Sequence, residues 1–181
     1  MNKSLPIIYS INKFKVALYL LGAILLVAAG ILVLYNCLHE QGRYLLGSIE
    51  LTYGIAILAI LFFGYASVMF ISKLFSNKPG IVINEQGIFE NATAVVNGLI
   101  PWQDITSVEL YKMQSQKFVL VYVKNPEEYI AKQKNIIKKK SMQANLKTHG
   151  TSIFINTNML NVSDIELAIV IKQQLDKNML K

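Results

Sequence analysis

The residues with chemically reactive side chains are few, and they are scattered along the chain. Cys37 is the only cysteine, which excludes an internal disulfide and a zinc site built from cysteine pairs. Cys37 stands two residues before His39, His149 has no cysteine near it, and no metalloprotease, nucleophile-elbow, P-loop or dinucleotide-binding spacing occurs. The paired acids Glu127 and Glu128 stand at an expected helix start, where the helix dipole accounts for them. We therefore predict that the chain is not an enzyme and has no catalytic residue, metal site or cofactor.

Lysines crowd one stretch of the chain and are the strongest candidates for binding. They are Lys132, Lys134, Lys138, Lys139, Lys140 and Lys147. With Glu127 and Glu128 they give residues 126–147 a charge of +4. The plainest interpretation is a solvated helix face. The second is contact with an anionic leaflet, where each lysine contributes on the order of 1 kcal/mol. Nucleic-acid binding fits least, because the stretch has one aromatic residue and no arginine for base stacking or readout.

The composition indicates that part of the chain lies in lipid. Of 181 residues, 53% are apolar and only 16% are charged, whereas a soluble domain carries about a quarter charged residues. The apolar residues concentrate in two uncharged runs, at residues 16–36 and 51–71. Each is long enough to cross a hydrocarbon core of about 30 Å as a helix. We predict two transmembrane helices joined by a short external turn at residues 37–50, with small residues such as Gly30 and Ala56 allowing close packing.

Two alternatives to the first span are weaker. A cleaved signal peptide has a shorter apolar core, and no small-residue cleavage site follows this run. A lipoprotein signal needs a small residue before its cysteine, and Asn36 stands there instead. We therefore interpret Cys37 as an ordinary thiol near the membrane interface.

The basic residues predict the orientation of the two spans. Lys3, Lys13 and Lys15 precede the first span, Arg43 lies in the turn, and Lys73 and Lys78 follow the second span. By the positive-inside rule, this distribution places both termini in the cytoplasm, with residues 1–15 as a basic cytoplasmic segment.

Residues 79–181 have the composition of a separate cytoplasmic domain. Short β-branched runs predict a hairpin across 80–90, with Gly87 supplying positive φ, and a second hairpin joining 105–111 to 118–123. Residues 126–147 predict one Lys-rich helix, along which Ile130, Ile137 and Ala144 form an apolar stripe of period seven. A strand at 152–156 follows. A C-terminal helix at 163–180 begins with a capping box of Ser163 and Glu166, and we expect it to bury Ile165, Ala168, Ile169 and Leu175.

The stretch from Gly98 to Ile105, GLIPWQDI, together with the Gly-Ile pairs at 80–81 and 87–88, resembles the bacterial pleckstrin-homology-like domains. That resemblance implies an α+β fold: a seven-stranded split β-barrel with a C-terminal capping helix, commonly preceded by one or two transmembrane helices. In it, Gly98 and Pro101 belong to the structural motif, Trp102 anchors the barrel wall, and Asp104 caps a turn. The inserted Lys-rich helix departs from the family pattern and is similar to a two-span subfamily of unknown function.

The resemblance does not extend to phosphoinositide binding, because the first hairpin loop, Asn84 to Gly87, is short and acidic. It does imply a bacterial cytoplasmic membrane. From the spans and the lysines we expect the bilayer, anionic lipid head groups, and an unknown protein or second copy as partners, and no nucleic acid. The first functional hypothesis is a non-catalytic scaffold or accessory protein. The alternative is self-immunity against a membrane-active peptide or bacteriocin. A channel is weakest, because two spans without buried charge form no pore alone.

Overall fold

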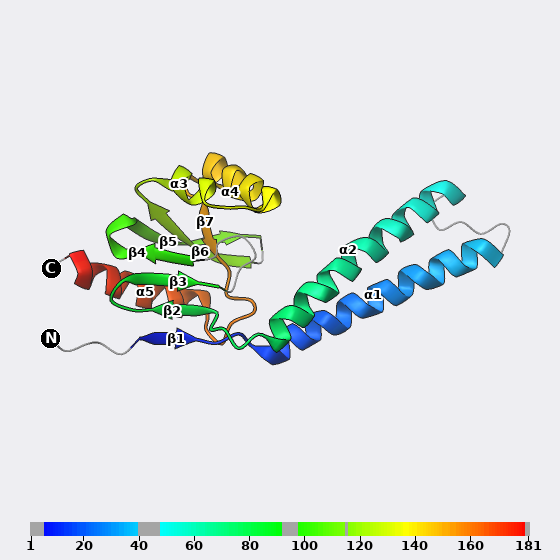
Figure 1. The fold of residues 1–181 in the computed structure, drawn as a ribbon, viewed down its shortest axis with the longest axis horizontal. Coiled ribbons are helices and arrows are strands. Elements are labelled where there is room, and N and C mark those ends of the chain that lie inside the picture. The colour runs from blue at the N-terminus through cyan, green and yellow to red at the C-terminus, as the bar shows by residue number, and fades with distance from the viewer. Residues whose placement is uncertain (1–5, 40–47, 92–97, 115, 180–181) are drawn as a thin grey trace. The chain divides into compact units, whose positions relative to one another are not determined.

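The computed structural model describes residues 6–39, 48–91, 98–114 and 116–179 (Figure 1). The chain divides into two compact units. One is residues 13–77, and the other combines the N-terminal residues up to Asn12 with residues 78–181. The units are called the helical hairpin and the α+β domain below.

The helical hairpin consists of α1 (Lys13–His39) and α2 (Ile49–Phe75), which pack along each other. Each has 27 residues, or about 40 Å of helix, and both are long and apolar enough to cross a membrane. Both extend beyond the apolar runs. The expected turn at 37–50 is therefore shorter on both sides, and its residues 40–47 lie outside the described part of the chain.

Close approach of the two helices depends on small side chains. Ala23 and Gly30 of α1 and Ala56 of α2 are buried between them. A Cβ atom added at Gly30 would lie 2.8 Å from Ile60 Cγ1, so this position has no room for a side chain without a shift of Ile60. At the open end of the hairpin, Lys13 Nζ donates to the carbonyl oxygens of Lys73 (3.0 Å), Leu74 (2.6 Å) and Ser76. This ammonium group satisfies the last carbonyls of α2 and offsets its dipole.

The first sheet of the α+β domain has four antiparallel strands in sequence order: β1 (Ile7–Tyr9), β2 (Ile81–Ile83), β3 (Gly87–Glu90) and β4 (Gly98–Pro101). The register aligns Ile7, Ile83, Ile88 and Ile100 in one row. The last three of these are fully buried, so this row forms the inner face of the sheet. The sequence predicted the β2–β3 hairpin.

The sequence did not indicate β1, which precedes the helical hairpin and pairs with β2, which follows it. Further bonds hold the same N-terminal segment. Gly80 N donates to Tyr9 O (2.9 Å), Asn12 N to Met159 O (2.8 Å), and Asn161 N to Ser10 O (3.1 Å). The segment from Ile7 to Asn12 is thus built into the domain.

The turn between β2 and β3 depends on Asn84 and Gly87. Asn84 Oδ1 accepts from the backbone N–H groups of Gln86 (2.9 Å) and Gly87 (3.2 Å), which is an Asx turn. Gly87 has φ +154°, as expected from the sequence, and a Cβ atom there would collide with the carbonyl oxygen of Ile100.

The second sheet has the order β5 (Ile105–Met113), β6 (Gln116–Val123), β7 (Ile153–Ile155), all antiparallel. The run predicted to be a central strand, FVLVYV, is the middle strand β6, and Val119, Leu120 and Val121 are buried in it. The predicted β5–β6 hairpin is confirmed. A short 3₁₀ turn, η1 (Trp102–Asp104), joins the first sheet to the second.

The single Lys-rich helix predicted at 126–147 is wrong. Two helices occupy this stretch: α3 (Pro126–Ala131) and α4 (Ile136–His149). The break falls at residues 132–135, because Asn135 caps a new helix, its Oδ1 accepting from Ile137 N (2.9 Å) and Lys138 N (3.2 Å). Gly150 ends α4.

The C-terminal helix α5 (Asp164–Met179) packs on β5 and β6. Ser163 Oγ accepts from Glu166 N (3.2 Å), as the capping box requires. The expected buried face was partly wrong: Ala168 and Leu175 are buried, with Leu167 and Ile171, whereas Ile165 and Ile169 are about half exposed. The buried set, with spacings of one, three and four residues, is the face that meets the sheet.

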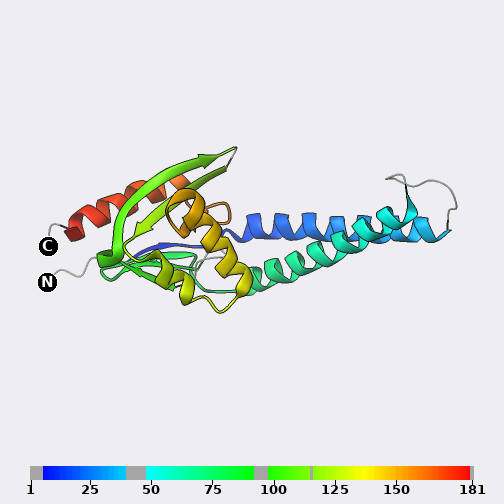
Figure 2. The ribbon, with the colours of Figure 1, turned by 90° about the horizontal axis from the view of Figure 1, so that it is seen from above.

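The fold is therefore α+β: a helical hairpin, then two antiparallel sheets and a C-terminal helix. Figures 1 and 2 show α3 and α4 beside β7, and Figure 1 shows them well apart from α5 within the domain. The two sheets do not join into a closed barrel among the described residues. The domain core between them is aliphatic, with Ile81, Ile88, Leu120 and Leu167 among its fully buried side chains.

Candidate functional site

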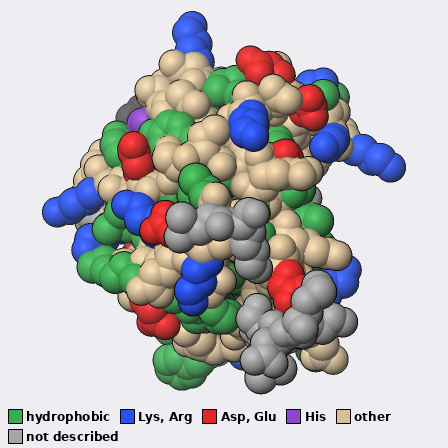
Figure 3. All heavy atoms as spheres, turned by 90° about the vertical axis from the view of Figure 1, so that its left-hand side faces the viewer, with side chains coloured by type: hydrophobic (Ala, Val, Ile, Leu, Met, Phe, Trp, Pro, Cys, Tyr) green, Lys and Arg blue, Asp and Glu red, His purple; other side chains and the backbone are tan. Residues whose placement is uncertain are grey.

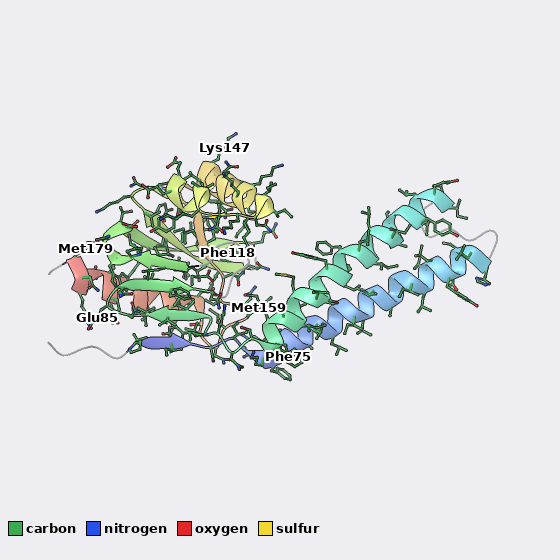
Figure 4. The ribbon with its side chains drawn as sticks, viewed as in Figure 1. Phe75, Glu85, Phe118, Lys147, Met159 and Met179 are labelled. Atoms are coloured by element: carbon green, nitrogen blue, oxygen red, sulfur yellow. The ribbon has the colours of Figure 1, made fainter. Side chains whose placement is uncertain are left out.

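The six candidate lysines all lie on α4 and in the break that separates it from α3. Lys132 ends α3, with its Nζ 5.2 Å from the ring centre of Tyr129, and Lys134 lies in the break. Lys138, Lys139, Lys140 and Lys147 belong to α4. Lys138 is half-buried and the other five are exposed. Figure 4 shows Lys147 projecting away from the sheets.

The break between α3 and α4 changes the apolar pattern as well as the helix length. Ile130 is buried on α3, but Ile137 is 75% exposed and Ala144 is exposed on α4. The predicted stripe of period seven is therefore wrong, because the break resets the helical phase between Ile130 and Ile137. Met142, at 0% exposure, is the residue that α4 buries instead.

An open hollow of about 370 Å³ lies between α3 and α4. Lys139 and Lys147 line it from α4, and Glu127 lines it from α3. The carboxylate and the two ammonium groups leave this hollow with a net positive charge. No charged side chain that lines it is buried, so it has no enclosed polar site.

The motif residues that carried the family resemblance lie between the two sheets and serve to join elements. Gly98 opens β4 and Pro101 closes it. Trp102 is buried, and its Nε1 donates to Asn84 O at 2.8 Å, which ties η1 to the β2–β3 turn. Asp104 Oδ2 accepts from the hydroxyl of Tyr129 at 2.7 Å, which ties η1 to α3.

The Tyr129–Asp104 pair has the strongest electrostatic signature in the domain. Burial, the hydrogen bond to Asp104 and the charges of Asp104 and Glu128 all raise the pKa of the Tyr129 hydroxyl well above its ordinary value. The phenol therefore stays protonated and acts as a donor. This is a structural hydrogen bond, since a phenol whose pKa is raised is a poor general acid at neutral pH.

A second, larger groove of about 880 Å³ lies at the end of the domain where α5 finishes. Its apolar floor includes the buried Trp102 and Leu175, and Glu85, Lys124 and Met179 stand at its rim. Glu85 and Met179 mark this end in Figure 4. In the space-filling view of the same end, acidic and basic side chains are interspersed, so no single sign of charge dominates it (Figure 3).

The outer face of the first sheet carries an apolar row that sequence reasoning missed. Ile8, Val82, Phe89 and Leu99 are cross-strand neighbours in the register. Ile8 is 58% exposed, Phe89 42% and Leu99 40%. Alternation along each strand could have revealed three of these positions, but not Ile8, because β1 was not expected. We call these four residues the outer row.

The other residues with titratable or metal-binding side chains lie apart from one another. His39 stacks on Tyr35 in the hairpin, whereas His149 contacts the rings of Tyr111 and Phe154 in the domain. The carboxyl group of Glu90, which the sequence did not single out, is fully buried on β3. Within the described residues, no group of three histidine, cysteine or acidic side chains could hold a metal ion.

Comparisons of the chain with family models, with curated proteins and with solved structures find no match. Three surfaces of the described molecule are candidates for binding: the lysines of α4 and of the break before it, the groove beside α5, and the outer row.

Proposed function

We propose that the chain is a non-catalytic scaffold protein anchored in a bacterial cytoplasmic membrane by its helical hairpin, with the α+β domain in the cytoplasm. The observation that carries this proposal is the hairpin itself. Its two apolar helices leave large side chains such as Leu58, Leu61 and Phe62 about two thirds exposed. Water would penalise so much exposed apolar surface, whereas lipid would cover it.

The pairing of β1 with β2 supports the two-span topology. β1 precedes α1 and β2 follows α2, so strand pairing requires both ends of the hairpin on the same side of a membrane. Two spans meet this requirement, and one span does not. The choice of the cytoplasmic side rests on the positive-inside rule applied to Lys13, Lys15, Lys73 and Lys78, with Lys3 and Arg43 outside the described residues.

The architecture also supports a pleckstrin-homology-like origin for the domain. The described residues contain seven strands in sheets of four and three, and the C-terminal helix packs on the second sheet. The GLIPWQDI stretch lies at the junction of the two sheets. In this inference the first strand is supplied from before the hairpin, so the domain needs both flanks of the membrane anchor.

The roles of the acidic groups support a non-catalytic function. Asp104 accepts from Tyr129, Asp164 from the buried Thr157 at 2.7 Å, and Glu109 from Tyr122 at 3.2 Å. These carboxylates join elements of the fold.

The scaffold's protein-binding surface is the outer row, which is apolar and uncharged and so suits a protein partner or a second copy. The immunity hypothesis stays a prediction from architecture.

The anchoring is tested with the single native cysteine. In intact cells, a membrane-impermeant maleimide should label Cys37, which lies near the outer end of α1 in this topology, and alkaline carbonate should not extract the chain. A matched variant carries Cys37→Ser and Gln173→Cys, with its thiol on an exposed position of α5. It should react only after lysis. Labelling of the α5 cysteine in intact cells would contradict the topology, and extraction by carbonate would contradict the anchoring.

The outer row is tested by photo-crosslinking in the membrane. Benzoylphenylalanine in place of Phe89 should form adducts on illumination, whereas the same group in place of Gln173 on α5 should not. An adduct of twice the 20.3 kDa chain mass identifies a second copy, and any other discrete mass identifies a partner protein. Equal, diffuse adducts from both positions would remove the outer row as a binding surface.

A further inference from the structure

The start of α4 presents two adjacent isoleucines to solvent. Ile136 is 71% exposed and Ile137 is 75% exposed. Both lie in the first turn of α4, where the side chain of Asn135 accepts a hydrogen bond from Ile137 N. Among the described residues of the α+β domain, they are the most exposed large aliphatic side chains. Buried Met142 and half-buried Leu146 face the domain, so the isoleucines are not a displaced part of its core.

The isoleucines are surrounded in the sequence by positive charge only. Between Glu128 and Asp164 there is no acidic residue, and the six lysines of the break and α4 all fall in this interval. Lys134 precedes the isoleucine pair by two positions, and Lys138 to Lys140 follow it directly. The positive end of the helix dipole lies at the same place.

The outward face of α4 carries both kinds of side chain. With 100° per residue, Ile136, Lys140 and Lys147 lie within about 40° of one another around the helix, and Ile137 lies beside them. Met142 lies on the opposite side. The result is a helix surface with an aliphatic tip and a lysine stripe behind it, which is the pattern of helices that lie in a membrane interface.

The domain is tethered close to the hairpin by short connections. Residues 76–80 separate α2 from β2, and residues 10–12 separate β1 from α1. Five residues extend at most about 18 Å. If the hairpin spans a bilayer, the leaflet surface is therefore always within reach of the domain, so a weak contact is enough to hold it there.

We propose that α4 docks on the anionic leaflet of the membrane that holds the hairpin, with Ile136 and Ile137 entering the boundary between head groups and acyl chains. Lys134, Lys140 and Lys147 then contact lipid phosphates. This inference rests on the membrane anchoring proposed above. The charge of α4 favours the leaflet over a protein partner, because a basic helix surface with an aliphatic tip matches anionic head groups above hydrocarbon.

The test uses the full chain reconstituted in vesicles, in a Cys37→Ser background. Ile137→Cys carries the environment-sensitive fluorophore NBD, and Gln173→Cys on α5 carries the same probe as the matched control. Vesicles of phosphatidylcholine are compared with vesicles in which about one third of the lipid is phosphatidylglycerol. We expect the probe at position 137 to shift its emission to the blue and to be quenched by nitroxide-labelled lipid only in the anionic vesicles, while the control probe stays in water.

The possible outcomes distinguish contact with lipid, contact with protein and failure of the membrane anchoring. Emission at position 137 equal to that of the control in both vesicles overturns the inference while leaving the anchoring intact. A blue shift in both vesicles without quenching by nitroxide lipid means that protein covers the isoleucines, which also overturns it. If carbonate washes the chain off the vesicles, the anchoring and the leaflet contact fail together.

The lysines are tested in the same assay. Lys134→Gln, Lys140→Gln and Lys147→Gln together should lower the docked-to-undocked ratio by about a hundredfold, at roughly fivefold for each lysine near an anionic surface. The three corresponding arginine substitutions should retain docking, because they keep the charge. Docking that survives the glutamine substitutions and high salt would overturn the electrostatic part of the inference.

Discussion

At the scale of single residues, the hydroxyl of Tyr129 connects parts of the domain that are far apart in sequence. Its bond to Asp104 joins α3 to the η1 turn, and the indole of Trp102 in the same turn bonds to the β2–β3 loop. The two bonds together fix η1 between the sheets. Because Trp102 is the only tryptophan, its fluorescence reports on this region alone.

We expect Tyr129→Phe to destabilise the domain by about 2 kcal/mol, because it removes a partly buried hydrogen bond to a carboxylate. The raised pKa predicts a pH dependence too. In the unfolded chain Tyr129 ionises at its ordinary pKa of 10.0, whereas in the folded domain its raised pKa keeps it protonated. The hydroxyl therefore contributes its full share of the free energy of unfolding below pH 10, and this share is lost as the pH rises above 10. Denaturant unfolding of the full chain in detergent, followed by Trp102 fluorescence at pH 8 and above pH 10, measures both effects.

Tyr122→Phe is the control for this substitution. The hydroxyl of Tyr122 donates to Glu109 at 3.2 Å on an exposed surface. Removing this hydroxyl should therefore lower the free energy of unfolding much less than Tyr129→Phe does. Equal losses for the two variants would mean that the Tyr129–Asp104 bond has no special role.

At the scale of elements, the two neighbouring isoleucines of β1 lie on opposite faces of the first sheet. Ile7 joins the inner row with Ile83, Ile88 and Ile100, whereas Ile8 belongs to the exposed outer row. We expect Ile7→Asn to destabilise the domain by about 2 kcal/mol and Ile8→Asn by less than about 0.5 kcal/mol. The unfolding assay with Trp102 fluorescence compares them. If the two variants lose the same stability, β1 is not paired in the described register.

The elements that the sequence predicted were those with local signals. Gly87 and Asn84 indicate the first turn, the FVLVYV run indicates a central strand, and Ser163 indicates the start of α5. Each signal is read from a few adjacent residues. The two apolar runs were equally plain, because long stretches without charge have few alternatives.

The elements that the sequence did not predict depend on distant partners or on one competing cap. β1 has three residues, and its partner β2 lies beyond both helices of the hairpin, so no local pattern marks it. The break before α4 depends on Asn135, whose capping bonds outweigh the helix propensity of the neighbouring lysines. An unbroken helix was assumed, and this placed Ile137 in an apolar stripe. The candidate lysines stay a prediction, and the exposed isoleucines beside them were missed.

At the scale of the whole molecule, the chain encloses its helical hairpin within one domain. The α+β domain takes its first strand from before the hairpin and the rest from after it. The domain therefore cannot complete its first sheet until the whole hairpin has been made, and in a membrane both flanks must reach the same side. A chain built in this way couples completion of the helical hairpin to the folding of the α+β domain.

This arrangement predicts that the hairpin can be removed without loss of the domain, provided that β1 is kept. Replacing residues 13–77 by a short Gly-Ser linker leaves β1 and β2 as antiparallel neighbours, with Tyr9 opposite Ile81. We expect a soluble protein with one cooperative unfolding transition and the buried-tryptophan emission of the full chain.

The matched variant begins at Lys78 and so lacks β1, Ile11 and the bonds from Ser10 and Asn12 to residues 159–161. It should unfold at lower denaturant concentration or aggregate, because the edge of β2, the buried Leu160 and the inner row lose their cover. Equal stability of the two variants would show that the N-terminal strand adds nothing to the domain, and with it the argument that both flanks of the hairpin share one side would lose its support.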